Sequence, residues 1–346
     1  MRHPFAAADL AHIVARVGDW DAMRGAHCVV TGGTGYLGGW LVEALRAADD
    51  AHGLGVRLTL VTRDPARAHA THPGWAADRR IAWITADVRT LPALPRDTTH
   101  AIHAAAESST IADPDDHRAQ FTTVLDGTRT LLDRLAETEV RQLLFVSTGG
   151  VYGRSALAER LDEASGFAPD PTDVRSAYDE AKRAAELLVT LEGRRGLVAP
   201  IVRLFASVGP GLPLDAHFAV GNFLRDALAG GPITVRGDGT AVRSYLYAAD
   251  VAAWCWRALF HGVSGRAYNV GAELALSTRE LALRVAQVTE LQPTAVRVLG
   301  EAPRGGQAQR LVPDTARART ELEVAEWIDI DDALRRTIAW HRATHD

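Results

Sequence analysis

One glycine-rich turn constrains the fold of this 346-residue chain more than any other segment: Thr31-Gly32-Gly33-Thr34-Gly35-Tyr36-Leu37-Gly38-Gly39. It follows an apolar run of strand length and opens a helix-like stretch, which is the context in which such a turn binds a dinucleotide. Gly32, Gly35 and Gly38 permit the tight turn, the close approach of backbone to a pyrophosphate, and close packing of helix on strand. The first N–H groups of the helix, at Tyr36 and Leu37, would face the phosphates. The turn therefore predicts a site for NAD or NADP.

Short apolar runs alternate with amphipathic stretches along the first two thirds of the chain. Runs of strand length lie at 27–31, 57–62, 81–86, 100–104, 142–147 and 199–205, and helix-like stretches lie at 37–47, 124–137 and 177–191. Continuous apolar strands separated by helices predict an α/β fold with a doubly wound parallel sheet, a Rossmann domain. We expect this domain at 26–208. An N-terminal helical extension is expected at 1–25, and a smaller substrate-binding lobe, with segments returning to the core, at 209–346.

The overall composition argues against several classes of protein. A net charge of -5 and a pI near 6.2 do not favour a nucleic-acid partner, which needs a basic excess. No apolar stretch is long enough to span a bilayer, and the N-terminus lacks the features of a signal peptide. Cys28 and Cys255 lie in apolar stretches and are expected to be buried thiols of a reducing compartment. The thirteen histidines show no metal-ligand spacing, so we expect no metal site. Together these features lead us to expect a soluble cytoplasmic protein.

The residues after the second strand bear on the choice between NAD and NADP. An acidic residue there binds the ribose hydroxyls of NAD, whereas a basic one accommodates the phosphate of NADP. Arg63 favours NADP, but Asp64 is adjacent, and moving the strand end by one residue would favour NAD. Farther on, Asp87 and Val88 follow the third strand, where a carboxylate can hold the adenine amino group. Ala104, at the end of the fourth strand, lets the cofactor lie close.

A tyrosine and a lysine four residues apart give the second constellation. Tyr178 and Lys182 fall on one face of a helix beyond the fifth strand. A phenol is a poor base at neutral pH, and we expect the neighbouring ammonium to lower its pKa, so that it can exchange a proton with a substrate hydroxyl. The lysine can also hold the nicotinamide ribose. At the end of the fifth strand, Thr148 is the expected hydroxyl partner of the reacting oxygen, supported by Ser147.

Together these motifs resemble a known family, the extended short-chain dehydrogenases of the NAD-dependent epimerase/dehydratase type, which act on nucleotide sugars. The likeness rests on the glycine turn, Asp87, the run Ser147–Gly153, the Tyr178/Lys182 pair and Arg203 with Gly209-Pro210-Gly211. It covers nearly the whole chain from His27 onward. It implies an enzyme that acts on a nucleotide-diphosphate sugar, and a homodimer formed through the helices at 124–137 and 177–191.

The residues after Thr148 bear on which reaction is catalysed. In 4,6-dehydratases of the family the next two residues are an acid and a base, but here they are Gly149 and Gly150, so dehydration lacks its side chains. Small residues there resemble 4-epimerases, which need space for a 4-keto sugar to rotate. The sequence therefore predicts a 4-epimerase first. Three alternatives stay open: an NADPH-dependent 4-ketoreductase, favoured by Arg63; a glucuronate decarboxylase or 4,6-dehydratase; and a cofactor-binding sensor without catalysis, which the retained Tyr178 and Lys182 disfavour.

A local likeness to the decarboxylases lies around the tyrosine. The segment Tyr178-Asp179-Glu180-Ala181-Lys182 is similar to theirs. Because Asp179 and Glu180 are expected to face away from Tyr178, we interpret this likeness as ancestry rather than chemistry.

The same resemblance implies residues for the nucleotide end of the substrate. Arg243 and Arg310 match segments whose arginines meet the pyrophosphate, and Asn222 is placed to bond phosphate or sugar. His217 lies in a substrate loop but is expected to be incidental. The chain departs from the family at Ala206 and at Val124, each of which stands where relatives often have asparagine.

Overall fold

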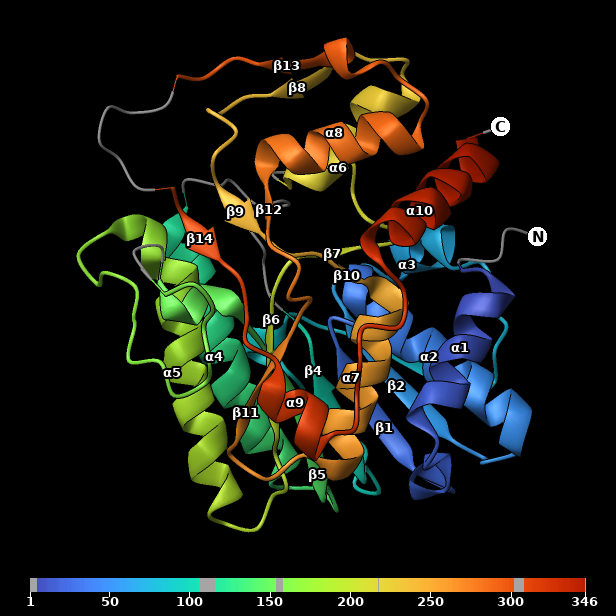
Figure 1. The fold of residues 1–346 in the computed structure, drawn as a ribbon. Helices are drawn as coiled ribbons and strands as arrows, with labels where there is room; N and C mark the ends of the chain where they lie inside the picture. Colours follow the sequence, from blue (N-terminus) through green and yellow to red (C-terminus); the bar gives the residue numbers. More distant parts are fainter. Residues whose placement is uncertain (1–4, 106–115, 154–157, 217, 302–307, 346) are drawn as a thin grey trace.

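A seven-stranded parallel sheet forms the centre of the protein (Figure 1). The computed structural model describes residues 5–105, 116–153, 158–216, 218–301 and 308–345. The strands are β1 (His27–Thr31), β2 (Arg57–Thr62), β3 (Ile81–Thr85), β4 (His100–His103), β5 (Gln142–Thr148), β6 (Ile201–Leu204) and β11 (Ala267–Val270). Their order is β11-β6-β5-β4-β1-β2-β3, and every neighbouring pair is parallel. The predicted doubly wound α/β fold is confirmed.

The order of the strands reverses between β1 and β4. From β1 the chain builds outward through β2 and β3, then returns to the other side of β1 and continues through β4, β5 and β6. In open sheets of this type ligands bind at the carboxyl ends of the strands, at the point of reversal. The glycine turn follows β1 and Ala104 follows β4, so both lie at that point.

Helices cover both faces of the sheet, as its continuous apolar strands require. On one face α4 (His117–Leu135) packs against α5 (Ala177–Gly193), and on the other α2 (Tyr36–His52) packs against α7 (Ala248–His261). Adjacent residues of a strand accordingly enter different cores. In β1, Val29 belongs to the core under α4 and α5, whereas Cys28 and Val30 belong to the core under α2 and α7. Figure 1 shows the two layers on opposite sides of the sheet.

The N-terminal extension forms a helix that docks on the second layer. Helix α1 (Ala7–Val17) packs on α2 and α7 through its buried Ile13 and Val17, and the short helix η1 (Trp20–Met23) follows it. The predicted amphipathic helix is thus present. The last helix, α10 (Ile330–His345), lies near α3 (Pro65–Thr71), and Figure 1 shows both on the side of the molecule where the chain begins.

A smaller group of elements lies over the carboxyl edge of the sheet (Figure 1). Its helices are α6 (Ala219–Leu228) and α8 (Thr278–Val288), and its strands are β7 (Ser207–Val208), β8 (Ile233–Val235), β9 (Val242–Arg243), β10 (Leu246–Tyr247), β12 (Leu276–Ser277), β13 (Val296–Val298) and β14 (Arg310–Leu311). Helix α9 (Ala316–Glu321) lies instead beside β11 of the central sheet. Single helical turns are η2 (Val88–Thr90), η3 (Gly149–Tyr152), η4 (Val174–Ser176) and η5 (Pro293–Ala295). Between them the chain returns to the core as α7 and β11. In the described residues no helix is long and apolar enough to cross a membrane.

Candidate active site

The glycine turn is packed so tightly that side chains are excluded from it. Gly32 has φ +72°, and a Cβ there would overlap the backbone of Ala104 and Ala105. A Cβ on Gly38 would lie 2.7 Å from Cα of Gly33 and would overlap Gly32. The turn therefore touches the end of β4 and the start of α2 with backbone alone. Such a cradle leaves room for a pyrophosphate beside the first N–H groups of α2, and the residues present fit a dinucleotide.

A cleft of about 730 Å³ opens beside this cradle. Seven of the predicted cofactor residues line it: Gly32, Gly35, Tyr36, Arg63, Asp87, Val88 and Ala104. Four predicted residues do not: Leu37 packs on the hydrophobic core, Gly38 lies against the turn, and Tyr178 and Lys182 lie on α5. The sequence did not predict Phe5, Arg67, Trp340 and Thr344, which also line the cleft. These come from the two ends of the chain and from α3, and no local motif marks them.

At the adenosine end of the cleft the structure separates the roles of Arg63 and Asp64. Strand β2 ends at Thr62, so Arg63 is the first residue after it. Asp64 is the N-cap of α3, and its carboxylate accepts a hydrogen bond from the Arg67 N–H at 2.9 Å. The carboxylate of Asp64 is thus used by the helix. A basic residue rather than an acidic one stands at the end of β2.

Asp87, at the end of β3, lies in the cleft as a paired carboxylate. Arg89 donates to both of its oxygens, at 2.9 and 2.8 Å. This bidentate hydrogen bonding is the main reason that the pKa of Asp87 lies below its usual value. Asp87 is therefore ionised at neutral pH and can accept a hydrogen bond from an adenine amino group, as the sequence predicts.

Helix α5 carries Tyr178 and Lys182 one turn apart at its N-terminal end. The Lys182 ammonium is buried, donates to the carbonyl of Val146 at 2.7 Å, and lies 6.0 Å from the centre of the Tyr178 ring. Burial lowers the pKa of Lys182 to about 8, against the opposing effect of the Glu186 carboxylate. Lys182 is the single lysine of the chain; the remaining basic residues among its 38 lysines and arginines are arginine. Because arginine cannot lose its charge in proteins, only a lysine at this position can have a pKa lowered toward neutral pH.

Tyr178 differs from the sequence-based expectation. Its pKa is raised, first by burial and second by the charge of Asp179. The predicted lowering by Lys182 is therefore wrong for the cofactor-free protein, because desolvation of the phenolate and the adjacent carboxylate both favour the phenol. At neutral pH Tyr178 holds its proton and is a donor.

The two hydroxyl groups at the end of β5 point to opposite sides of the strand, as successive side chains must. Ser147 is buried and donates to Glu186 at 2.6 Å, and Arg203 donates to both oxygens of Glu186 at 3.0 and 2.7 Å. The hydroxyl proton of Ser147 is thus bound to Glu186, and its role in substrate binding stays a prediction. Thr148 is half-buried, and its Oγ1 accepts from the Gly150 N–H at 3.0 Å.

The space beside Gly149 and Gly150 is filled by other side chains. A Cβ on Gly149 would lie 3.0 Å from the ring of Phe205, and one on Gly150 would lie 2.5 Å from Cγ of Asp179. The Asp179 carboxylate thus lies against η3, and its direction relative to Tyr178 stays a prediction. Because Gly150 has no side chain, the Asp179 carboxylate takes the place that one would occupy. The glycines do not by themselves leave an open space for a rotating sugar.

The two arginines predicted for the diphosphate lie on neighbouring strands of one small sheet. Strand β9 pairs in parallel with β14, with Arg310 opposite Val242 and Leu311 opposite Arg243. Because successive side chains of a strand point to opposite faces, Arg243 and Arg310 lie on different faces of this sheet. Arg310 donates to the carbonyl of Glu159 at 2.6 Å, and Arg243 to that of Val242 at 2.8 Å. Their convergence on one diphosphate stays a prediction.

Other predicted residues are not joined to this sheet. Asn222 lies on α6, and its amide oxygen accepts from Arg225 at 3.0 Å. His217 lies outside the described residues. Cys28 and Cys255 are buried free thiols, and burial raises the pKa of each to about 12. Within the described ranges no three His, Cys, Asp or Glu side chains are grouped as a metal site would require.

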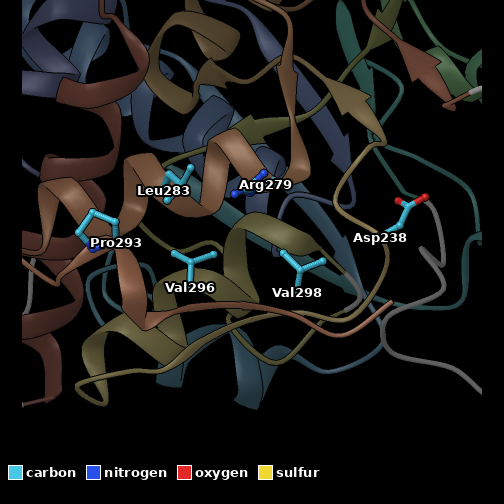
Figure 2. A pocket seen from close by; sticks show the side chains of 6 residues that line it. All are labelled: Asp238, Arg279, Leu283, Pro293, Val296 and Val298. Carbon is cyan, nitrogen blue, oxygen red and sulfur yellow. The ribbon is translucent and has the colours of Figure 1, made fainter. Parts of the chain in front are cut away.

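A second cavity, of about 280 Å³, lies in the smaller lobe between α8, η5 and β13 (Figure 2). Its lining is Asp238, Arg279, Leu283, Pro293, Val296 and Val298. Asp238 already accepts hydrogen bonds from the N–H and hydroxyl of Thr240. We assign no chemistry to this cavity.

Comparison with known proteins agrees with this geometry. Residues 28–271 match the model of the NAD dependent epimerase/dehydratase family. The chain is 31% identical to UDP-glucuronic acid decarboxylase 2 of Arabidopsis thaliana over 79% of its length, and it spans 58% of the length of that relative.

Two solved structures are similar over most of the chain. The dTDP-glucose 4,6-dehydratase of Streptomyces venezuelae, solved with NAD bound, has a TM-score of 0.78 and 25% identity, with 92% of this chain and 98% of that one covered. The UDP-glucose 4-epimerase of Thermus thermophilus, also solved with NAD, has a TM-score of 0.73 and 26% identity, with 91% and 99% covered. The chain therefore belongs to the NAD-dependent epimerase/dehydratase family, whose members are enzymes that modify nucleotide sugars.

Proposed function

We propose that this enzyme carries out nicotinamide-dependent redox chemistry at C4 of a nucleotide sugar, and that its reaction is reduction of a 4-keto sugar with NADPH. The observation that carries the proposal is the position of Arg63. This positively charged residue directly follows β2 and precedes Asp64, whose carboxylate caps α3. NADPH, unlike NADH, brings a phosphate to this position, and a guanidinium suits that group. The adjacent Arg67 lines the same end of the cleft.

The protonation of Tyr178 agrees with reduction. Reduction of a ketone needs a proton donor at the oxygen, and burial keeps Tyr178 in the phenol form. Thr148 is assigned a second hydrogen bond to the same oxygen, and Lys182 a bond to the nicotinamide ribose. The nicotinamide, when bound, supplies the hydride to C4. Asp87, Val88, Ala104 and the glycine turn are assigned to the rest of the dinucleotide, and Arg243, Arg310 and Asn222 to the nucleotide end of the sugar.

A titration with the two reduced cofactors tests the proposal. We expect NADPH to bind at least about tenfold more tightly than NADH, because a guanidinium–phosphate bond is a charge-assisted hydrogen bond. The Arg63→Ala variant should lose most of this preference while its affinity for NADH changes little. Arg129→Ala, which removes an exposed arginine paired with Asp126 on α4, is the matched control. Equal affinities for the two cofactors in the parent protein would contradict the assignment.

The second candidate is the 4-epimerase that the sequence predicts. It uses the same tyrosine, lysine and threonine, and a solved 4-epimerase is among the similar structures. The two reactions differ in mass balance. Sugars linked to UDP, dTDP, CDP and GDP, each with a C4 hydroxyl and as the 4-keto derivative, would be incubated with and without NADPH and their products identified by mass and NMR. A gain of two hydrogens supports the reductase, and an isomer of unchanged mass the epimerase. Loss of carbon dioxide or water would contradict both.

A further inference from the structure

The Asp179 carboxylate fills the space beside Gly150. It comes from the residue after Tyr178 on α5, and it lies where a side chain on Gly150 would be. Gly150 in turn donates its N–H to the hydroxyl of Thr148 at 3.0 Å. The carboxylate therefore lies against the residue that hydrogen-bonds Thr148, and Asp179 follows Tyr178 in the chain; Thr148 and Tyr178 are the two groups that the proposed function assigns to the sugar oxygen at C4. Asp179 is half-buried.

The remaining charges of this helix turn are directed elsewhere. Lys182 is buried against β5, where it donates to Val146. Glu180 lies 3.8 Å from Arg183, which donates to the carbonyls of Val151 and Phe167. Of the two acids that follow Tyr178, Asp179 is the one that lies against η3, the turn of Gly149 and Gly150. The influence of its charge on Tyr178 agrees with this closeness.

We propose that Asp179 is a general base for the carbon next to the C4 ketone, so that the enzyme exchanges a proton at that carbon in addition to its redox step at C4. The inference rests on the proposed function, because a hydrogen becomes acidic enough for a carboxylate only beside a carbonyl group. It gives the substrate class as a 4-keto nucleotide sugar that carries hydrogen at C3 or C5.

The step balances without any oxidant or reductant. The Asp179 carboxylate takes the proton, and the electron pair of the broken C–H bond forms a double bond to C4. The C4 carbonyl becomes an enolate oxygen, whose charge is stabilised by hydrogen bonds from Tyr178 and Thr148. Return of the proton from Asp179 restores the ketone. Because Asp179 exchanges its proton with water, the returned hydrogen comes from solvent.

The test is hydrogen exchange in deuterium oxide without NADPH. The probe is a 4-keto-6-deoxyhexose joined to dTDP or UDP, followed by proton NMR and mass spectrometry, with the rate in the absence of enzyme subtracted. The parent protein should add deuterium at C3 or C5 without reducing C4. Asp179→Asn should lower the enzyme-dependent rate at least about tenfold, since a positioned base contributes about 10² to 10⁴. Gly150→Ala should also lower it, because its Cβ displaces the carboxylate. Glu180→Gln, with an unchanged circular dichroism spectrum, is the control and should exchange like the parent.

Each outcome decides for or against the inference. Loss of exchange in Asp179→Asn and Gly150→Ala but not in Glu180→Gln supports it. No exchange above background by the parent would overturn it, even if NADPH is oxidised normally, and the proposed function would stand. Equal exchange by parent and Asp179→Asn would also overturn it. Failure of the parent to change C4 of any tested sugar, with either cofactor, would instead contradict the proposed function.

Discussion

Lys182 shows how one residue combines a functional role with a cost in stability. Its ammonium is almost completely buried and has a pKa of about 8, below the value near 10.5 of an exposed lysine. Below pH 8 the folded protein therefore holds a charge that it solvates less well than water does. Burial costs stability here and at the same time places the ammonium 6.0 Å from the centre of the Tyr178 ring.

We expect the Lys182→Met variant to be more stable than the parent at pH 7, by at most about 3 kcal/mol, from 1.36 kcal/mol per unit of pKa. Between pH 8 and 10.5 the unfolded parent binds the proton that the folded parent has lost. The free energy of unfolding of the parent therefore rises with pH in this window, and the advantage of the variant shrinks. Urea unfolding of both proteins from pH 7 to 10 measures this.

The single lysine provides an independent control. Selective ¹³C labelling of lysine gives one side-chain resonance, and its titration reports the pKa of Lys182 directly. A value near 10.5, together with a stability difference that does not change with pH, would show that the ammonium is not desolvated as described.

At the scale of elements, the short helix α3 links local folding to the choice of cofactor. Asp64 caps it, and Arg63 precedes the cap. Asp64→Ala should destabilise the protein by about 1 kcal/mol, because one N–H at the start of the helix loses its partner. Its affinity for NADPH should change little, since the carboxylate serves the helix. A large loss of NADH affinity in this variant, measured by fluorescence titration, would instead assign Asp64 to the ribose.

Elements with strong periodicity were predictable from the sequence, and those defined by distant contacts were not. Six strands of the sheet lie where apolar runs predict them. Strand β11 was not predicted; the side chain of its Asn269 is bound to the carbonyls of Leu161 and Asp314, which are distant in the sequence. In the site, Arg243 and Arg310 lie on paired strands, and their convergence on one diphosphate stays a prediction. The place of Asp179 could not be predicted, because it depends on the close approach of α5 to η3.

At the scale of the whole molecule, the two ends of the chain meet and help to close the cofactor cleft. Asp9 of α1 is buried, and it accepts hydrogen bonds from the Tyr247 hydroxyl at 2.7 Å and from Arg336 of α10 at 2.6 Å. His12 of the same helix lies 2.8 Å from Asp250 of α7. The bond from Arg336 ties α1 to α10, whose Trp340 lines the cleft.

The Asp9→Asn substitution should therefore lower both the stability of the protein and its affinity for the cofactor. We expect a loss of about 2 to 4 kcal/mol in the free energy of unfolding, because a buried partner of Arg336 and Tyr247 loses its charge. NADPH should bind more weakly as α10 loosens, although Asp9 does not line the cleft. Denaturant unfolding and cofactor titration of the same preparation measure both effects. Asp332→Asn, which removes a surface partner of Arg336, should change either quantity far less. If Asp9→Asn is destabilised but its cofactor affinity is unchanged, the position of α10 does not affect cofactor binding.

The outer faces of α4 and α5 also belong to this scale. Phe121, Leu187 and Leu191 are exposed there, between 37% and 61% of their surface. A homodimer through these helices, as the sequence predicts, would cover them; the homodimer stays a prediction.

The most direct test of the central claim follows the hydrogen that reaches C4. The protein would be incubated with a 4-keto nucleotide sugar and NADPH that carries deuterium at the transferable position, and the product examined by NMR. The account predicts deuterium at C4, a hydroxyl in place of the ketone, and a rate at least about 100-fold lower for Tyr178→Phe. No label at C4 of the ketone, together with inversion at C4 of a 4-hydroxy nucleotide sugar supplied separately without NADPH, would select the epimerase. A product that has lost carbon dioxide or water, or a Tyr178→Phe variant as fast as the parent, would contradict the account.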